Sequence, residues 1–537
     1  MVMRRIVGSG VVALILSVTP LLAAETTHAV PLAVGAAVMG KAVAAGTRQV
    51  FDPEAAAGDY VKGTLRVEAG VFDLDLVDSE GRHLRRLAEG AGGVAEFQFV
   101  AEGSGVRLVA TADREGTYVL GIERKVGVAD QRPAPTAYLS PAIAGIAAVV
   151  ATGGTTEAFW AMVTDRGTPL VEDGQDGRKV VTFLGRGAKR NIRLFGAPSG
   201  DHEELQRLGG SDIWFKSFEV PDDTRLSYQL AFDVPYVPGT ARDRRVAVLS
   251  TAKADPLNRH GWPAEAKDAY NQDSVLELAG APPQPFLAEK GNPQGRLNTL
   301  SVESRLLGNR RDITFYYPPG FDPARKDTIL LFVFDADQYL GRVPVPRILD
   351  NMIAAGAVPP VVAVFVANPD RAARARELPA NLAFADFMAT ELHPLVAKET
   401  GLVVPAARTV LAGSSYGGLA SATVAMRHPE VFGNVLAMSG SFWWSPPGTP
   451  EDRREHVAGL IAAGPALPLR FFLSAGLFET GAQGTAGILE TSRHLRDVLQ
   501  AKGISVIYRD YAGGHDYLVW QGVISDGLIA LFGGDRP

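Results

Sequence analysis

The sequence predicts a multidomain protein in which two β-rich domains precede a doubly wound, largely parallel α/β sheet. Three observations lead to this prediction. Short alternating apolar runs fill the chain up to about residue 125, further strand-like runs lie between residues 150 and 288, and continuous apolar runs alternate with helical stretches after residue 291. The length agrees, because 537 residues can bury several separate cores.

The first 24 residues have the features of a secretory signal peptide. An arginine pair at residues 4–5 precedes the apolar run from Ile6 to Leu22, and the small residues Ala23 and Ala24 follow it. We therefore expect a periplasmic or secreted protein. An uncleaved N-terminal membrane anchor is the alternative, because the run is long for a signal peptide. No later segment approaches the about 18 continuous apolar residues that span a bilayer, so no stable membrane insertion is expected after cleavage.

Composition excludes several kinds of site. The chain has no cysteine, which rules out disulfides, thiolate metal ligands and a cysteine nucleophile. The formal net charge is -6, so there is no basic excess to neutralise phosphates. Nucleic acid is therefore not expected as a partner.

The first β-rich domain is expected at residues 30–126. Its runs alternate apolar and polar residues, as in Val71 to Val77, and turns such as Asp78 to Gly81 separate them. This pattern is typical of a β-sandwich of the jelly-roll kind. The Pro-rich stretch from Gln131 to Pro135 then predicts a linker.

A second β-rich domain is expected at residues 150–288. Ala-rich helical segments, Pro141 to Val150 and Thr156 to Asp165, stand at its start. Strand-like runs follow at residues 180–184, 191–195, 213–220 and 226–232. The Pro-rich segment from Ala281 to Pro285 closes the domain.

The doubly wound sheet is expected at residues 291–537. Its strands are continuous apolar runs, which indicate burial on both faces, at residues 328–334, 361–366, 409–412, 435–438 and 469–473. Helical stretches alternate with them at residues 382–400, 418–428 and 485–501. This βα alternation predicts a largely parallel sheet with helices on both faces.

Ser415 is the candidate nucleophile. It stands at the centre of Gly413-Ser414-Ser415-Tyr416-Gly417, after an apolar strand and before a helix. Small residues two before and two after such a serine allow a sharp turn and a close approach of helix and strand. The context predicts the nucleophile elbow of an α/β-hydrolase fold. The alternatives are a Gly/Ser-rich helix cap and Ser414 as the nucleophile.

A serine nucleophile needs a general base and an orienting acid. His515 is the candidate base, because it lies in a Gly-flanked loop after a predicted strand and C-terminal to the serine. Glu479 is the candidate acid, since it follows a late strand and gives the chain order Ser415, Glu479, His515. Asp510 and Asp516 are the alternative acids.

Two backbone N–H groups are expected to bind the oxyanion. One belongs to Tyr416, the residue after the nucleophile. The other comes from the loop after the first apolar strand, near Ala336 and Asp337. The reaction is acyl transfer to water, for which no metal or other cofactor is expected.

At these residues the chain resembles the enterochelin (enterobactin) esterase family, α/β hydrolases that open the trilactone backbone of catecholate siderophores. The resemblance covers roughly residues 155–535. It rests on segments 205–214, 254–258, 413–418, 428–434, 438–444, 475–479 and 513–520. It implies a serine esterase whose small-molecule substrate is a ferric catecholate siderophore, in an exported form with an added N-terminal β-sandwich.

A basic cluster and a Trp pair are the candidate substrate-binding residues. Arg371, Arg374 and Arg376 follow the apolar strand 361–366, at the carboxyl edge where α/β sheets bind ligands. Guanidinium groups are suited to pair and stack with an aromatic anion such as a ferric catecholate. The alternative for them is a solvated helix start. Trp443 and Trp444 are expected to wall the same pocket, with core packing as their alternative.

Two other functions are compatible with the same residues. A related esterase would act on feruloyl or acetyl esters of plant polysaccharide, with the β-sandwich binding carbohydrate. A periplasmic protein that binds siderophores on an inactive hydrolase scaffold is the non-enzymatic alternative, although an intact serine, acid and histidine in the right order argue against it.

Overall fold

A computed structural model of the chain describes residues 16–17, 28–128, 131, 137–198, 200, 202–481 and 485–534. They form two compact units, which divide between residues 136 and 137. The predicted signal peptide lies outside the described residues except for Leu16 and Ser17, and the predicted linker lies outside them except for Gln131. Within the described part, no helix combines the length and the apolar character needed to cross a membrane.

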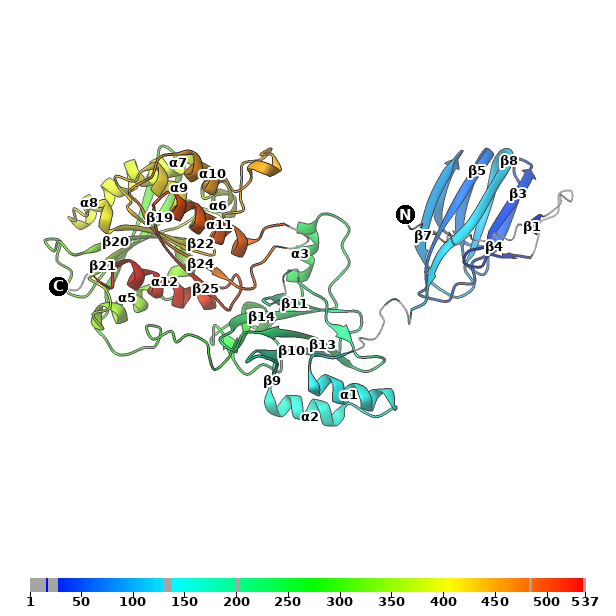
Figure 1. Cartoon of the computed structure of the whole chain (residues 1–537), viewed down its shortest axis with the longest axis horizontal. Helices are drawn as coiled ribbons and strands as arrows, with labels where there is room; N and C mark the ends of the chain where they lie inside the picture. The colour runs from blue at the N-terminus through cyan, green and yellow to red at the C-terminus, as the bar shows by residue number, and fades with distance from the viewer. Residues whose placement is uncertain are drawn as a thin grey trace, which may run out of the picture. The chain divides into compact units, whose positions relative to one another are not determined.

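The first unit is built around two long, bulged strands that pair with each other along their whole length, β5 (Tyr60–Val77) and β8 (Arg107–Val126) (Figure 1). The shorter strands are β1 (Leu16–Ser17), β2 (Val30–Pro31), β3 (Ala37–Val43), β4 (Arg48–Asp52), β6 (His83–Ala91) and β7 (Val94–Val100). β6 and β7 pair with β5, whereas β3 and β4 pair with β8. Alternate residues such as Val61, Leu65 and Leu74 fill one buried core, which agrees with the predicted alternation.

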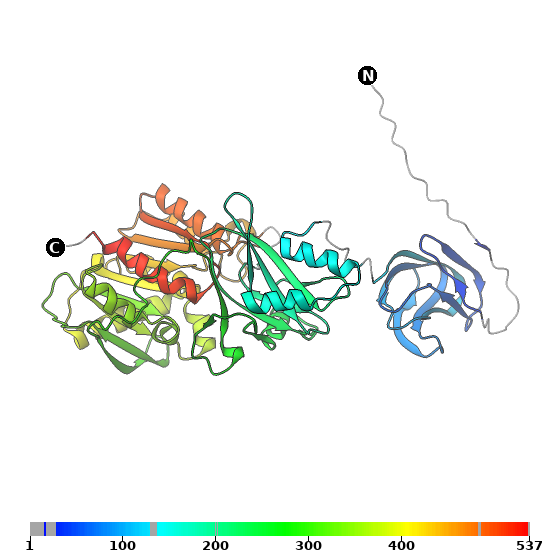
Figure 2. The same cartoon turned by 90° about the horizontal axis from the view of Figure 1, so that it is seen from below.

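The second unit begins with the predicted middle domain. Its elements are α1 (Pro141–Ala151), α2 (Glu157–Arg166), β9 (Leu170–Asp173), β10 (Lys179–Arg186), β11 (Ile192–Gly196), β12 (Gln206–Arg207), β13 (Ile213–Val220), β14 (Arg225–Phe232), α3 (Ala241–Leu249), β15 (Ala252–Lys253), β16 (Gly261–Trp262) and β17 (Asp273–Glu277). One antiparallel sheet has the order β12-β13-β10-β9, and the other has β11-β14-β17-β16 with β15 beside β14. Phe183 and Tyr228 belong to the core between the sheets. Helices α1 and α2 pack on the first sheet through residues such as Ile143 and Trp160 (Figures 1 and 2).

The remainder of the second unit is the α/β sheet. Its strands are β18 (Arg296–Ser304), β19 (Asn309–Tyr317), β20 (Ile329–Phe334), β21 (Val361–Val366), β22 (Thr409–Ser414), β23 (Asn434–Met438), β24 (Arg470–Gly476) and β25 (Ser505–Tyr511). Their order in the sheet is β18-β19-β21-β20-β22-β23-β24-β25. The strands from β21 to β25 run parallel, as predicted, whereas β18 and β19 are antiparallel. The sequence analysis missed this antiparallel hairpin.

Helices cover both faces of the sheet, which gives three layers (Figure 1). On one face lie α7 (Leu382–Asp386), α8 (His393–Thr400), α9 (Tyr416–Arg427), α10 (His456–Ala463) and α11 (Ile488–Ala501). On the other face lie α4 (Ala336–Leu340), α5 (Val345–Ala354) and α12 (Tyr517–Phe532) (Figure 2). The predicted helix 382–400 is interrupted by a π-helical stretch, Phe387–Leu392.

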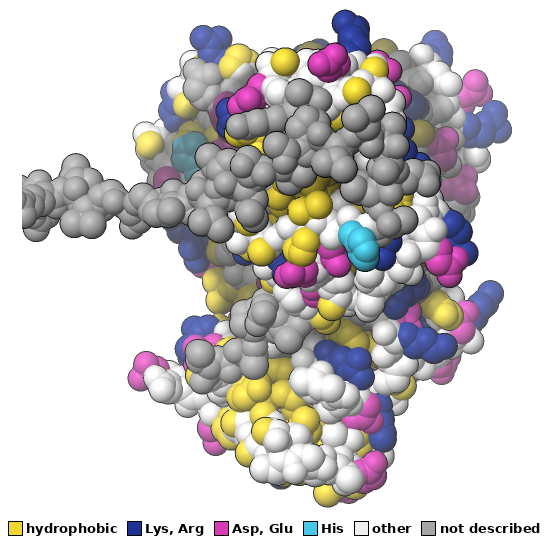
Figure 3. All heavy atoms as spheres, turned by 90° about the vertical axis from the view of Figure 1, so that its right-hand side faces the viewer, with side chains coloured by type: hydrophobic (Ala, Val, Ile, Leu, Met, Phe, Trp, Pro, Cys, Tyr) yellow, Lys and Arg dark blue, Asp and Glu magenta, His cyan; other side chains and the backbone are white. Residues whose placement is uncertain are grey.

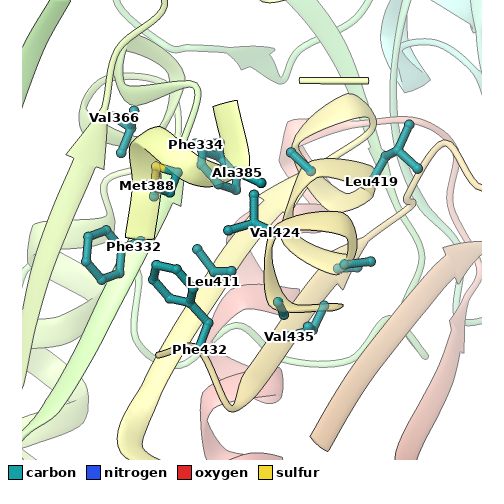
Figure 4. Packing of buried hydrophobic residues seen from close by; sticks show 14 of the residues in the cluster. Phe332, Phe334, Val366, Ala385, Met388, Leu411, Leu419, Val424, Phe432 and Val435 are labelled. Carbon is teal, nitrogen blue, oxygen red and sulfur yellow. The ribbon is translucent and has the colours of Figure 1, made fainter. Parts of the chain in front are cut away.

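The core beneath α9, the helix that follows Ser415, is tightly filled (Figure 4). Phe332 and Leu411, from neighbouring strands, face Val424 of α9 and Phe432 of the following turn. These side chains are at most 1% exposed, so the strand and helix on either side of Ser415 are fixed by packing. The elbow is therefore held between two rigid elements.

Charge is mixed over the surface shown in Figure 3. Basic and acidic side chains are interspersed there, and some hydrophobic side chains gather near the middle of the face. The mixture accords with the near balance of 53 basic and 59 acidic residues in the sequence.

Candidate active site

Ser415 lies at the sharp turn between β22 and α9. Its backbone angles are φ 56° and ψ −122°, a strained conformation for a residue with a side chain. A β-carbon on Gly413 would come within 2.6 Å of the Gly417 backbone, and one on Gly418 within 2.9 Å of Gly440 Cα. The small residues around the serine are thus required by close approach of the backbone. This is the geometry of a nucleophile elbow.

His515 and Glu479 form a hydrogen-bonded pair. His515 Nδ1 lies 2.6 Å from Glu479 Oε1. The Glu479 side chain is only 3% exposed, whereas that of His515 is 42% exposed. A carboxylate can only accept, so Nδ1 carries the proton and Nε2 is left as the acceptor nitrogen. This is the tautomer that a general base acting on a serine requires.

The second carboxylate oxygen of Glu479 is also held. Its Oε2 accepts hydrogen bonds from the Ser439 hydroxyl at 2.7 Å and from the Gly476 N–H at 2.6 Å. The Ser439 hydroxyl in turn accepts a hydrogen bond from Trp520 Nε1 at 3.0 Å. Both carboxylate oxygens are therefore engaged, and the Glu479 side chain has one orientation.

The two alternative acids bond elsewhere. Asp510 accepts from Arg493 Nη2 at 2.7 Å and from the Tyr508 hydroxyl. Asp516 accepts from the backbone N–H groups of Ser227 at 2.6 Å and Leu518 at 2.9 Å. Glu479 is the acid in contact with the His515 ring.

The two nucleophile candidates are placed differently. Ser414 is 1% exposed and lies within β22. Ser415 lines a cavity together with His515. Its hydroxyl lies 3.4 Å from that of Ser441, and the described side chains show no hydrogen bond from Ser415 to His515.

The predicted oxyanion groups stand at the starts of two helices. Tyr416 is the first residue of α9, and Ala336 and Asp337 are the first two of α4. N–H groups in the first turn of a helix have no acceptor within the helix. Tyr416, Ala336 and Asp337 are nevertheless not among the described residues that line the cavity. These helices follow β22 and β20, which are neighbours in the sheet. Asp335, just before α4, has left-handed backbone angles, φ 59° and ψ 52°.

One residue of the predicted arginine cluster has a buried structural partner. Arg374, on α6 (Arg371–Glu377), donates to both carboxylate oxygens of the buried Asp335, at 2.7 and 2.8 Å. It therefore braces the loop that leads into α4. Arg376 lies 3.7 Å from Glu377, and Arg371 is exposed. None of the three arginines is among the described residues that line the cavity, so their placement does not support substrate binding.

The two tryptophans, Trp443 and Trp444, have different surroundings. Trp443 lines the cavity and is 42% exposed. Trp444 packs against the hydrophobic core, with its ring 5.8 Å from that of His456. Of the pair, Trp443 is placed to wall the pocket, whereas Trp444 follows the core-packing alternative.

The cavity has a volume of about 940 Å³ and two walls. Ser415, Ser441 and His515 belong to the α/β domain. The middle domain contributes another part of the lining: Phe195, His202, Ser227, Tyr228, Arg245 and Asp273. This wall could not be predicted from the sequence, because its residues carry no local motif.

On that wall the aromatic and basic groups stack. The rings of Phe195 and His202 are 4.6 Å apart and nearly parallel, and the Arg245 guanidinium lies 5.7 Å from the Phe195 centroid. Arg342, from the α/β domain, forms an ion pair with Asp273 and lies 4.3 Å from the Trp262 ring. The cavity lining thus combines aromatic rings and guanidinium groups with acidic side chains, among them Asp273, Glu451 and Glu455.

Comparison with known proteins agrees with this architecture. Residues 304–531 match the family model described as "Putative esterase", and residues 180–287 match "Enterochelin esterase, N-terminal". Iron(III) enterobactin esterase of Dickeya dadantii is 34% identical over 424 residues, which cover 71% of this chain and 94% of the relative. The chain belongs to the enterobactin esterase family. It is accordingly a carboxylic ester hydrolase.

Other members of the enterobactin esterase family align over a similar extent. Iron(III) salmochelin esterase of Escherichia coli O6:H1 is 27% identical over 70% of this chain and 93% of its own length. The crystal structure of ferric enterobactin esterase from Salmonella typhimurium superposes with a TM-score of 0.58 at 28% identity, covering 70% of this chain and 98% of that one. The enterobactin esterase of Shigella flexneri, crystallised in the presence of enterobactin, gives a TM-score of 0.55 at 28% identity, with 70% and 97% covered.

Proposed function

We propose that this esterase hydrolyses the trilactone ester bonds of catecholate siderophores such as ferric enterobactin, and so allows iron to be released. The observation that carries the proposal is the 2.6 Å bond between His515 and Glu479 in the cavity that Ser415 also lines. The names of the enterobactin and salmochelin esterases to which the chain is similar support the substrate class. The cavity volume of about 940 Å³ lies within the range of pockets that bind small molecules.

In the first step, Ser415 Oγ attacks the ester carbonyl carbon. His515 Nε2 takes the proton of the serine hydroxyl, and Glu479 stabilises the resulting imidazolium through Nδ1–H. The carbonyl oxygen becomes an oxyanion, which the N–H of Tyr416 and an N–H of the Ala336–Asp337 turn would hold. Removing one such donor typically costs about 3 kcal/mol of transition-state stabilisation.

The intermediate then collapses and the ester C–O bond breaks. The leaving alkoxide takes the proton from His515, which yields an alcohol and an acyl group on Ser415. Water attacks this acyl-enzyme while His515 accepts its proton. The bond between the acyl carbon and Ser415 Oγ then breaks, and His515 returns the proton to Oγ. The products are a carboxylic acid and the free Ser415 hydroxyl, so a cyclic trilactone first becomes a linear trimer.

The proton transfer requires the Ser415 hydroxyl to face His515. That hydroxyl lies 3.4 Å from the Ser441 hydroxyl. Catalytic hydrogen bonds are often long or misaligned without substrate and tighten in the Michaelis complex. A rotation about the Ser415 Cα–Cβ bond would exchange the Ser441 contact for one with His515 Nε2.

The choice of substrate is tested by product analysis. Purified protein is incubated separately with ferric enterobactin and with feruloyl oligosaccharide, and products are followed by mass spectrometry. The proposal predicts linear trimer, then dimer and monomer, from the siderophore with the wild type and none with Ser415→Ala. A higher kcat/KM on the sugar ester would replace the siderophore by a plant polysaccharide ester.

We also propose that the protein works outside the cytoplasm. The arginine pair at residues 4–5, the apolar run and the small residues at 23–24 support export. Cell fractionation followed by N-terminal sequencing tests this. A mature chain that begins near residue 25 in the periplasm or medium is expected, whereas a membrane-bound chain with residues 1–24 intact would indicate an anchor.

A further inference from the structure

The loop that carries His515 is attached to the middle domain. Strand β14 pairs with β11 only along residues 228–232, and its residues 225–228 pair with β17 on the other side. Along residues 225–227, the edge of β14 on the side of β11 contacts the His515 loop. Arg225 N–H donates to Ala512 O at 2.9 Å, and Ser227 N–H donates to Asp516 Oδ2 at 2.6 Å. These two N–H groups are two residues apart, so they leave the strand on the same side.

Asp516 connects the His515 loop, in which it lies, to the middle domain and to α12. Its Oδ2 accepts from the middle domain, and its Oδ1 accepts from the Leu518 N–H and so caps α12. Asp516 is 9% exposed and directly follows His515 in the chain. The cap and the connection to β14 together fix the backbone on the C-terminal side of the His515 ring.

The glycines before His515 make this attachment possible. A β-carbon on Gly514 would lie 2.5 Å from Ala197 Cβ, and one on Gly513 would lie 2.9 Å from Arg225 O. Both of these contacts are to the middle domain, and the β-carbon on Gly513 would also lie 2.7 Å from Val519 Cγ2 of α12. The glycine pair is therefore explained by the close approach of Ala197, which follows β11, of Arg225 in β14 and of Val519.

We propose that the middle domain is a working part of the catalytic centre, in which β14 holds the His515 loop and Asp516 is the positioning residue. The inference rests on the proposed function, because it takes His515 as the general base. His515 is 42% exposed, and among the described residues its ring is held by the Nδ1 bond to Glu479 and by the edge-to-face contact with Trp520. The backbone that carries the ring sets the rest of its position. A displacement of about 1 Å in a reacting group can lower the rate about 100-fold.

The hydrogen bond from the Ser227 N–H to Asp516 can be removed while the N-cap of α12 is kept. Asp516→Ser retains an N-cap residue for α12 but has no second oxygen to reach Ser227. We expect its kcat to fall about tenfold or more on both p-nitrophenyl butyrate and ferric enterobactin, with KM changed less than about twofold. Thermal unfolding should remain close to that of the wild type. A purely structural role for Asp516 would instead lower thermal stability and leave kcat unchanged.

The hydrogen bond between Ser227 and Asp516 can also be removed by a substitution in the middle domain. Ser227→Pro removes the backbone N–H, and Ser227→Ala is its matched reference because it changes the side chain but keeps the N–H. We expect kcat of Ser227→Pro to lie about tenfold below that of Ser227→Ala. The double variant Asp516→Ser/Ser227→Pro should be no slower than the slower single variant, because both changes remove one interaction.

Two outcomes would overturn the inference: wild-type kcat in folded Asp516→Ser, or losses that multiply in the double variant. If Asp516→Ser fails to fold, the Ser227 pair alone decides. The proposed function fails in a different way, since His515→Gln would then keep wild-type activity or the wild type would hydrolyse no ester at all.

Discussion

The indole of Trp520 meets the ring of His515 edge to face, with the centroids 4.8 Å apart and the planes at 88°. The same indole donates its N–H to the Ser439 hydroxyl, which donates to Glu479. One side chain thus contacts the candidate base directly and the candidate acid through a single hydroxyl. Trp520 is 3% exposed, so its own position is fixed by packing.

Trp520→Phe separates the two contacts. Phenylalanine keeps an aromatic edge against His515 but has no N–H for Ser439. Losing one buried hydrogen bond of about 1 kcal/mol should lower kcat about fivefold, with KM little changed. Steady-state kinetics on p-nitrophenyl butyrate measure this. Wild-type kcat in the folded variant would show that Ser439 needs no support from the indole.

Glu479→Gln should be far more damaging than its small change in shape suggests. Ser439 and Gly476 both donate to Oε2, so the single oxygen of glutamine will face them and its NH₂ will face His515 Nδ1. That arrangement protonates Nε2, which is the wrong tautomer for a base. We expect kcat to fall on the order of 10⁴-fold. A loss under about tenfold would remove Glu479 from the triad.

Gly514→Ala should reduce activity through a steric clash that can be relieved from the other side. The new β-carbon would lie 2.5 Å from Ala197 Cβ and push the His515 loop away from the turn that follows β11. We expect kcat to fall about tenfold or more. Adding Ala197→Gly removes the opposing carbon and should restore most of the activity. If the second substitution restores nothing, the clash is not the cause.

The half-buried His393 should make the fold sensitive to mild acid. Burial lowers the pKa of His393 below its ordinary value of 6.5, and its ring lies 6.1 Å from Phe432. Below that value the unfolded chain binds a proton that the folded chain does not. The free energy of unfolding should therefore fall as the pH drops from about 7.5 to 5.5. Thermal unfolding of His393→Leu should show a smaller drop over this range, and an equal drop would contradict the assignment.

The parts of the fold that follow one local pattern could be predicted. The run Val361–Val366 reads as a strand buried on both faces, and it is fully part of the central sheet. β19 was missed because its first four residues, Asn309 to Asp312, are polar or charged, which leaves only the short run from Ile313 to Tyr317. Its Arg311 is nonetheless buried, 2.7 Å from Glu377, and that partner lies on a separate helix. A buried ion pair between distant residues conceals such a strand from hydropathy.

The candidate site likewise contains residues that could be predicted from the sequence and residues that could not. Ser415, Glu479 and His515 each stand in a short motif of strand, turn and small residues, and the structure brings the last two into contact. Arg374 shows what the sequence could not decide, because a basic residue after a parallel strand can bind either a ligand or a buried carboxylate. Only the tertiary fold shows that Asp335 is its partner. The middle-domain wall required the packing of two domains and has no motif of its own.

The most direct test of the account is to find which serine reacts. The wild type and His515→Gln are treated with a fluorophosphonate, with and without excess ferric enterobactin, and the modified peptide is mapped by mass spectrometry. The account predicts one adduct on Ser415, formed far more slowly in His515→Gln and suppressed by the siderophore. An adduct on Ser414, or labelling that neither the His515 change nor the siderophore affects, would contradict it.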